Sequence, residues 1–245
     1  MCEWRPQDIR ARTSSTELPH APHSGPDAAL GIHVCQTDAA GGGCDKMARM
    51  SSLPDSMPAP PLLLRRWDEA DLPEVVAAIG RSIEDLRLWM DWAVDGVPSI
   101  ESERMVCRSG SADFDRDADW QYSLREIETG ELVGGCGLHP AVDTGRVKIN
   151  YWVRSDRHGL GYATVATHRL TDAAFEMLSH VREVQIRMDC ANVASARIPT
   201  KLGYQLAAEE AFDVLAHGHT GRGLVWSMTR DVWNPPSGSE KTQPT

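Results

Sequence analysis

A turn with two glycines is the part of this sequence whose residue types and spacing most favour binding chemistry. Gly159 and Gly161 follow an apolar run, INYWV, and precede a segment with helical periodicity. A strand that leads through a glycine turn into a helix N-terminus presents several unpaired backbone N–H groups at one point. Phosphate and pyrophosphate bind at such points. The stretch from Arg154 to Leu170 is therefore a candidate phosphate site.

The segments around this turn predict a mixed α/β sheet. Three segments before it have strand character and short turns between them, which predicts an antiparallel meander. They are WQYSLREI from Trp120, LVGGCGLH from Leu132 and VKINYWV from Val147. The three glycines of the second segment predict that something approaches its backbone closely. After the turn, a helical segment leads to a strand at 181–190, so these parts form a β-α-β unit with locally parallel strands.

This order argues against a dinucleotide-binding fold. In that fold the glycine turn follows the first strand of a parallel sheet, and an acidic residue lies roughly 20 positions further on. Here the turn follows antiparallel strands. Asp172 falls inside the helix, and Asp189 lies at the end of the next strand, too late for that role.

The rest of the pattern predicts one domain, 61–233, between two disordered segments. Residues 1–60 and 234–245 are rich in Pro, Gly and Ser, and have too few apolar residues to offset the entropy of ordering. A strand at 62–67 opens the domain. We expect one helix to end at Gly80, a second to begin at Ser82, and a third to cover 99–107 before a polar loop. A short helix from Asn192 to Leu202 and two last strands complete the domain.

Composition limits the classes of function. The net charge of −10 and the pI near 5.3 argue against a nucleic-acid surface, which needs clustered Lys and Arg. The six cysteines are scattered, and no apolar run approaches the roughly 20 residues that span a bilayer. We therefore expect a cytoplasmic protein without membrane or nucleic-acid partners. His33, Cys35, Cys44 and Asp45 match no zinc pattern, so no metal is expected.

Two motifs resemble the GNAT superfamily of acetyl-CoA-dependent N-acetyltransferases. In its pyrophosphate motif a Gln or Arg precedes two free residues, Gly, one free residue, then Gly or Ala. Gly161 and Ala163 match the small positions, whereas His158 stands in the Gln/Arg position, directly after Arg157. The second motif is CANVASARIPTKLGY, Cys190 to Tyr204. It is similar to the branch that acetylates the N-termini of ribosomal proteins, and the resemblance covers residues 62 to 233.

The resemblance implies a fold and a set of site residues. The fold is a mostly antiparallel central sheet with helices on both faces and one β-α-β unit that carries the acetyl-CoA loop. Acetyl-CoA is the implied acyl donor, and no metal is implied. The implied cofactor-binding residues are Trp152, Val153, Arg157, His158, Gly159, Leu160, Gly161, Tyr162, Ala163, Thr164, Asn192 and Ser195. Trp89 and Trp92 are the implied substrate-binding residues.

The resemblance also implies catalytic roles. Many relatives carry a Tyr that protonates the leaving thiolate, and Pro199 stands in that position here. Ser195 is therefore the candidate proton donor, and Asn192 orients the cofactor or the loop. His139 is the candidate general base, because its ordinary pKa lies near neutrality. Lys148 stands where relatives often carry a Glu, so Glu126, Asp143 and water remain alternatives for the base.

Simpler interpretations stay open for several of these residues. Ser195 also fits the N-cap of a helix, Asn192 a turn residue, and Trp89 and Trp92 core packing. The function implied is acetyl transfer to a primary amine, expected to be a protein N-terminus. A small-molecule acetyltransferase and a non-catalytic acyl-CoA-binding module are the alternatives. Either a monomer or a homodimer is compatible with the sequence.

Overall fold

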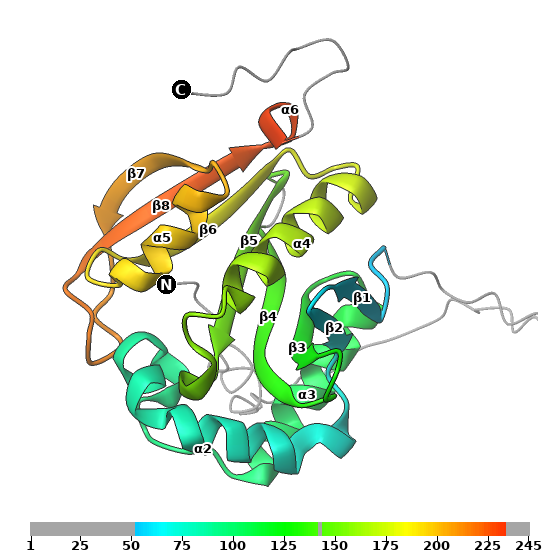
Figure 1. Ribbon diagram of the computed structural model, residues 1–245. Helices are drawn as coiled ribbons and strands as arrows, with labels where there is room; N and C mark the ends of the chain where they lie inside the picture. Colours follow the sequence, from blue (N-terminus) through cyan, green and yellow to red (C-terminus); the bar gives the residue numbers. More distant parts are fainter. Residues whose placement is uncertain (1–51, 142–143, 234–245) are drawn as a thin grey trace, which may run out of the picture.

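The computed structural model describes residues 52–141 and 144–233, which build one eight-stranded sheet (Figure 1). Its strand order is β1-β2-β3-β4-β5-β6-β8-β7. The strands are β1 Ser56–Ala59, β2 Leu62–Arg66, β3 Trp120–Glu126, β4 Leu132–Ala141, β5 Arg146–Val153, β6 Glu183–Asp189, β7 Gln205–Ala211 and β8 Arg222–Thr229. Neighbouring strands from β1 to β5 pair antiparallel, β3, β4 and β5 form a meander, and β5 pairs with β6 in parallel. The predicted meander and β-α-β unit are confirmed.

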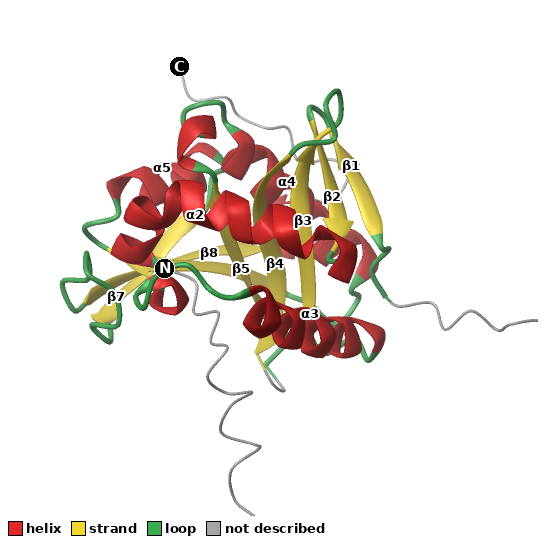
Figure 2. Cartoon of the chain, turned by 90° about the horizontal axis from the view of Figure 1, so that it is seen from below, coloured by secondary structure: helices red, strands yellow, loops and turns green. Residues whose placement is uncertain are grey.

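Helices cover both faces of this sheet. The α-helices are α2 Leu72–Trp89, α3 Ile100–Asp115, α4 Tyr162–Met177, α5 Val193–Lys201 and α6 Arg230–Trp233, and the 3-10 turns are η1 Glu69–Asp71, η2 Asp91–Ala93 and η3 Ser155–Arg157. α2 and α3 lie on one face, and α4 and α5 lie on the other (Figures 1 and 2). Within the described ranges, no helix combines the length and apolar character needed to cross a membrane.

The pairing of β5 with β6 stops part of the way along both strands. Its last pair is Ile149 with Ile186. Beyond it, β5 continues to Val153 alongside β4, and β6 continues to Asp189 alongside β8. The sheet therefore opens between two central strands, at the point where the chain leaves β5 for the glycine turn. This opening positions the site described below.

The ordered domain begins earlier than the sequence predicts. β1 pairs with β2 through the register Met57 to Leu64, and the side chains of Leu53 and Met57 are fully buried in the main core. The predicted boundary at residue 60 thus falls inside a hairpin. The pattern was missed because β1 is only four residues long and contains Pro58, which an edge strand tolerates. Residues 1–51 and 234–245 lie outside the described part of the chain.

Two predicted helix ends are also wrong. α2 continues through Gly80 to Trp89, because its buried face extends without a break from Val75 to Leu86. Glycine inside a helix costs about 1 kcal/mol, which this burial offsets. α3 continues to Asp115 rather than ending near Cys107, because Phe114 is buried and stacks edge-on against Tyr122 with ring centroids 5.4 Å apart.

Candidate active site

The glycine turn leads into the N-terminus of α4 with the geometry that the sequence predicts. Gly159 and Gly161 have φ angles of 80° and 81°, in the left-handed region that favours glycine. A Cβ at either position would meet no atom within 4 Å, so open space faces both residues. Gly161 caps α4 without a side-chain hydrogen bond. The first-turn N–H groups therefore face this space without a capping side chain, and an anion would satisfy them.

A groove of about 560 Å³ runs from this turn across the opening between β5 and β6. Most of the predicted cofactor-binding residues line it: Trp152, Val153, Arg157, His158, Gly159, Gly161, Tyr162, Ala163, Thr164, Asn192 and Ser195. Leu160 is the exception, because its side chain is 57% exposed and does not line the groove. His158 occupies the unusual motif position, and its Nε2 lies 2.9 Å from the carbonyl oxygen of Val153.

Three cationic side chains that the sequence analysis did not predict also line the groove. Arg187 of β6 and Arg197 and Lys201 of α5 line it, although the whole chain carries a net charge of −10. Arg187 forms an ion pair with Glu210, while Arg197 and Lys201 lie one turn apart on the same helix. That spacing was visible in the second motif and could have indicated a phosphate-facing surface.

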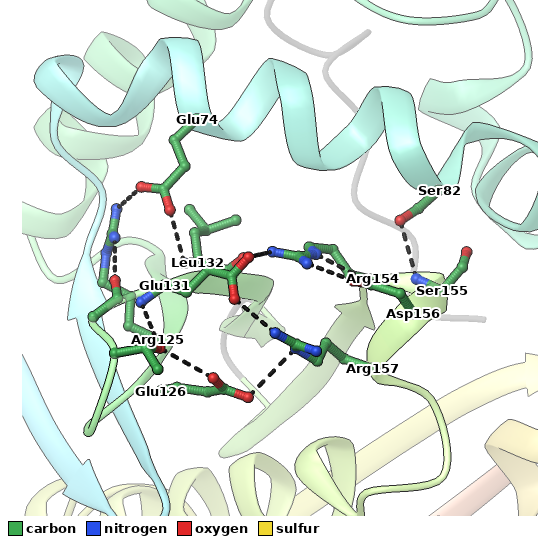
Figure 3. Close-up of polar contacts among 12 residues, drawn as sticks. Glu74, Ser82, Arg125, Glu126, Glu131, Leu132, Arg154, Ser155, Asp156 and Arg157 are labelled. Carbon is green, nitrogen blue, oxygen red and sulfur yellow. Dashed lines mark hydrogen bonds and ion pairs between the residues drawn. The ribbon is translucent and has the colours of Figure 1, made fainter.

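Arg157, which lies just before the glycine turn, is held by carboxylates on the β3–β4 hairpin (Figure 3). Its guanidinium lies 2.7 Å from Glu131 and 3.4 Å from Glu126. Hydrogen bonds from Arg154 and Arg157 lower the pKa of Glu131, so it stays ionised. Glu126 also accepts a hydrogen bond of 2.5 Å from the hydroxyl of Tyr162. Glu126 therefore belongs to the support of the loop, which argues against the role of general base considered for it.

Asn192 and Ser195 lie together at the start of α5, with distinct roles. The Asn192 side chain accepts the backbone N–H of Ser195 at 3.1 Å, so Asn192 is the N-cap of α5. The simpler interpretation of Ser195 as the cap is therefore wrong. Its hydroxyl Oγ lies 2.8 Å from the phenolic oxygen of Tyr151 on β5, and either atom can donate. Pro199, which stands where relatives carry a Tyr, is buried inside α5.

Tyr151 is the most informative residue that sequence reasoning missed. It comes from the apolar run before the glycine turn, whereas the implied tyrosine position lies in α5. Its hydroxyl contacts Ser195 across 44 residues of sequence. The structure thus places a phenol beside Ser195, but on strand β5 instead of helix α5. Only the position of Tyr151 in the INYWV run, next to the turn, could have indicated this.

A second, smaller cavity of about 80 Å³ lies between α2, α3 and the sheet. It shares three lining residues with the groove, namely Met90, Tyr151 and Trp152. Trp92 lines this cavity and packs edge-on against Trp152, with ring centroids 6.3 Å apart. Trp89 lines the larger groove instead. The structure therefore separates the two tryptophans predicted to bind the substrate.

The glycines of β4 make room for these indole rings. A Cβ on Gly135 would lie 2.7 Å from Nε1 of Trp152 and 2.9 Å from Cζ2 of Trp67. A Cβ on Gly134 would lie 2.2 Å from the carbonyl oxygen of Trp152. The predicted close approach to this strand is confirmed, and Trp67 and the β5 residue Trp152 are the groups that approach.

His139 lies outside both cavities. Its Nδ1 is 2.5 Å from Oδ2 of Asp119, and it pairs across the strands with Lys148. Burial lowers the pKa of His139, but the charge and hydrogen bond of Asp119 outweigh that effect, so the pKa is raised. The structure does not bring His139 together with Ser195 and Asn192. Asp143 lies outside the described residues. Among those described, no group of three or more His, Cys, Asp or Glu side chains is placed to hold a metal ion.

Several solved structures share this fold at low sequence identity. RimL, a ribosomal L7/L12 alpha-N-protein acetyltransferase in complex with coenzyme A, has a TM-score of 0.66 and 18% identity, covering 72% of this chain and 99% of its own. RimJ of Mycobacterium smegmatis, in complex with CoA-disulfide, has a TM-score of 0.61 and 20% identity, covering 69% of this chain and 81% of its own. The microcin C7 self-immunity acetyltransferase MccE, in complex with acetyl-CoA and AMP, has a TM-score of 0.65 and 14% identity, covering 73% of this chain and 98% of its own.

Sequence comparison identifies the family independently. No curated protein matches the chain closely enough to count as a relative. The acetyltransferase (GNAT) domain family, however, matches residues 61–205, which include the meander, the glycine turn and the Asn192–Ser195 motif. The sheet that opens beside the glycine turn has the fold of the structures above. The chain belongs to the GNAT family of acetyl-CoA-dependent N-acetyltransferases.

Proposed function

We propose that this enzyme transfers the acetyl group of acetyl-CoA to the α-amino group of a protein or peptide N-terminus. The observation that carries the proposal is the pair of cavities that meet at Met90, Tyr151 and Trp152. The groove on the α4 and α5 side suits the donor, and the cavity on the α2 and α3 side suits the acceptor. Donor and acceptor then approach the opened strands from opposite faces of the sheet.

The donor would bind through backbone and cationic groups. The N-terminus of α4 and the side chains of Arg197 and Lys201 suit the phosphates of CoA. The pantetheine arm would lie in the opening after Ile149, where β5 no longer pairs with β6. Backbone groups of the free β5 edge can hydrogen-bond this arm, and a backbone N–H there can stabilise the developing oxyanion of the thioester.

The chemistry would be direct attack of a neutral amine on the thioester carbon. A peptide α-amino group has a pKa of roughly 7.7–8.0, so a modest part is neutral at physiological pH. The nitrogen forms a bond to the acetyl carbon, the carbon–sulfur bond breaks, and the amine loses a proton while the thiolate gains one. Tyr151 and Ser195, joined by their 2.8 Å contact, are the groups proposed to deliver the proton to the sulfur.

The net charge of −10 would attract either kind of acceptor, because N-termini and small amines are both cationic near neutral pH. One comparison favours a protein acceptor over a free small amine. The solved structures of like fold include RimL, which carries the name of a ribosomal-protein N-acetyltransferase. A small-amine acetyltransferase stays the second candidate, because the inner cavity of about 80 Å³ holds only a small group.

The test measures the release of CoA thiol from acetyl-CoA with a panel of acceptors. The panel contains peptides with a free α-amino group, the same peptides with the α-amino group blocked, and small amines. We expect turnover with free peptides only, and a mass gain of one acetyl group at the α-nitrogen. Turnover confined to small amines would favour the second candidate. Tight binding of acetyl-CoA without turnover of any amine would instead indicate a non-catalytic module.

A further inference from the structure

A carboxylate lines the inner cavity but takes no part in the cofactor groove. Glu103 lies in the first turn of α3 and is one of two charged residues among the described residues that line this cavity. The other is Arg66, whose guanidinium binds Asp115 at 2.8 Å and Ser111, and lies over the ring of Phe114. The charge of Arg66 is therefore balanced within the protein, whereas that of Glu103 faces the cavity.

Glu103 has no partner of its own in the part of the chain that the structure describes. Its side chain makes no ion pair and no hydrogen bond there, and the neighbouring Arg104 and Arg108 both turn to Glu69. Burial raises the pKa of Glu103. An ionised carboxylate that is partly removed from water without a partner is unfavourable, unless a cation enters beside it. The site is therefore complementary to a ligand with a positive charge.

The remaining wall of the cavity determines which chemical group can lie beside the positive charge of the ligand. Apolar side chains from both helices line it, among them Leu72, Val75, Ile79, Val106 and Trp92. A volume of about 80 Å³ corresponds to several water-sized spheres, or to one small side chain. The cavity continues to Tyr151, whose hydroxyl contacts Ser195 at the proposed position of the thioester. An ammonium group attached to a small apolar group matches this combination of charge, lining and size.

We propose that Glu103 binds the acceptor amine in its ammonium form and takes up the proton that the nitrogen loses before it attacks the thioester. This inference rests on the proposed function and assigns its acceptor class, an amine whose neighbouring side chain is small and apolar. The proton moves from nitrogen to the Glu103 carboxylate and then to solvent. The lone pair that it leaves forms the bond to the acetyl carbon.

The simplest other role for Glu103 is to stabilise its own helix, because acidic residues in a first turn favour the helix dipole. Glu101 has the same placement in the first turn, is exposed and pairs with Arg104. The substitution Glu101→Gln therefore removes the same charge from the same helix end outside the cavity. It is the matched control for Glu103→Gln, and Glu103→Asp is the variant that keeps the charge.

The binding test uses CoA without its acetyl group, so that no reaction occurs. Calorimetry compares a short peptide that begins with alanine and the same peptide in which a hydroxyl replaces the α-amino group. We expect the wild-type protein to prefer the amine by about tenfold or more, since a hydrogen bond to a charged group is stronger than one between neutral groups. Glu103→Gln should abolish the preference, Glu103→Asp should keep part of it, and Glu101→Gln should keep it all.

Turnover provides the second readout. Glu103→Gln should lower kcat/KM for the peptide at least tenfold. Its affinity for acetyl-CoA and its melting temperature should equal those of the control Glu101→Gln. A wild-type protein without preference, or a Glu103→Gln protein that keeps the preference, overturns the assignment. If wild-type protein acetylates small amines but no peptide, the proposed protein acceptor is wrong. An amine and its alcohol analogue then replace the two peptides, and the same criteria decide the role of Glu103.

Discussion

The groove proposed for the donor and the inner cavity are built from different kinds of sequence segment. Short stretches supply much of the groove wall: the glycine turn with the first turn of α4, and residues 192–201 around α5. The cavity instead takes its wall from β2, α2, α3, β3, β4 and β5, which are far apart in the sequence. The groove offers backbone N–H groups and cations, while the cavity is mostly apolar with one unpaired carboxylate. A local motif can therefore indicate the proposed donor site, but the proposed acceptor site is visible only in the folded chain.

The largest effect is expected from a charge placed in the groove. Gly161→Asp puts a carboxylate at the N-terminus of α4, where the pyrophosphate is proposed to lie. Two charges about 4 Å apart repel by ~4 kcal/mol at an effective dielectric constant of about 20, so we expect acetyl-CoA affinity to fall at least a hundredfold. Calorimetry measures it. The control is Gly96→Asp, which has a φ of 102° and the same open surroundings but lies outside the groove. Equal affinities in the two variants would contradict the placement.

Filling the cavity should affect the acceptor and spare the donor. Val106→Phe enlarges a side chain that lines the cavity but not the groove. Displacing the amine by about 1 Å can lower the rate up to about a hundredfold, so we expect kcat/KM for the peptide to fall by about tenfold or more. The affinity for acetyl-CoA should stay unchanged. Met105→Phe, at the adjacent position but 57% exposed, is the control. A parallel loss of acetyl-CoA affinity would show that the two regions are not separate.

Where groove and cavity meet, Ser195 and Tyr151 should affect turnover more than binding. Ser195→Ala leaves the Asn192 cap intact, because that cap uses the backbone N–H of residue 195. We expect Ser195→Ala or Tyr151→Phe to lower kcat by about tenfold, since the remaining hydroxyl can still serve the sulfur. The double variant should lose more than either single variant. Steady-state kinetics at saturating acetyl-CoA measures this, and unchanged kcat in all three variants would exclude the pair as the proton donor.

The smallest effect concerns the helix end that the sequence mispredicts. Gly80 lies inside α2, and a Cβ there would lie 3.8 Å from Val97, an ordinary contact distance. Gly80→Ala should therefore raise the free energy of unfolding by about 0.5–1 kcal/mol, because alanine favours the helix. That corresponds to a melting temperature a few degrees higher. Thermal unfolding measures it, and a destabilised variant would show that Gly80 is needed for another reason. Neither substrate affinity should change.

The difference between local patterns and long-range packing also explains which parts of the fold the sequence alone could predict. The meander, the β-α-β unit and the turn at Gly159 and Gly161 were predictable, because each depends on a contiguous pattern of apolar residues and glycines. The helix ends at Gly80 and after Cys107 were mispredicted, because buried packing from Ile79 and Phe114 outweighs local preference.

The same difference between local patterns and long-range packing separates the predicted site residues from those that the sequence did not reveal. Asn192 and Ser195 belong to a local motif, and both line the groove at the start of α5. The contact of Tyr151 with Ser195 joins two elements that the sequence does not link, and the exposure of Glu103 to the cavity depends on how α3 packs against α2. His139 was proposed from its place at the end of the neighbouring strand and its ordinary pKa, and neither shows which groups its side chain contacts.

The central claim is that donor and acceptor meet from opposite faces of the sheet beside Tyr151. A crystal structure with a bisubstrate analogue, in which CoA is joined through an acetyl bridge to the α-nitrogen of an alanine peptide, tests it most directly. We predict that the pyrophosphate lies at Gly161, the bridge lies beside Tyr151 and Ser195, and the alanine side chain lies in the cavity with Glu103. A complex in which the peptide extends from the bridge along the α4 and α5 side of the sheet, with the cavity empty, would contradict this claim.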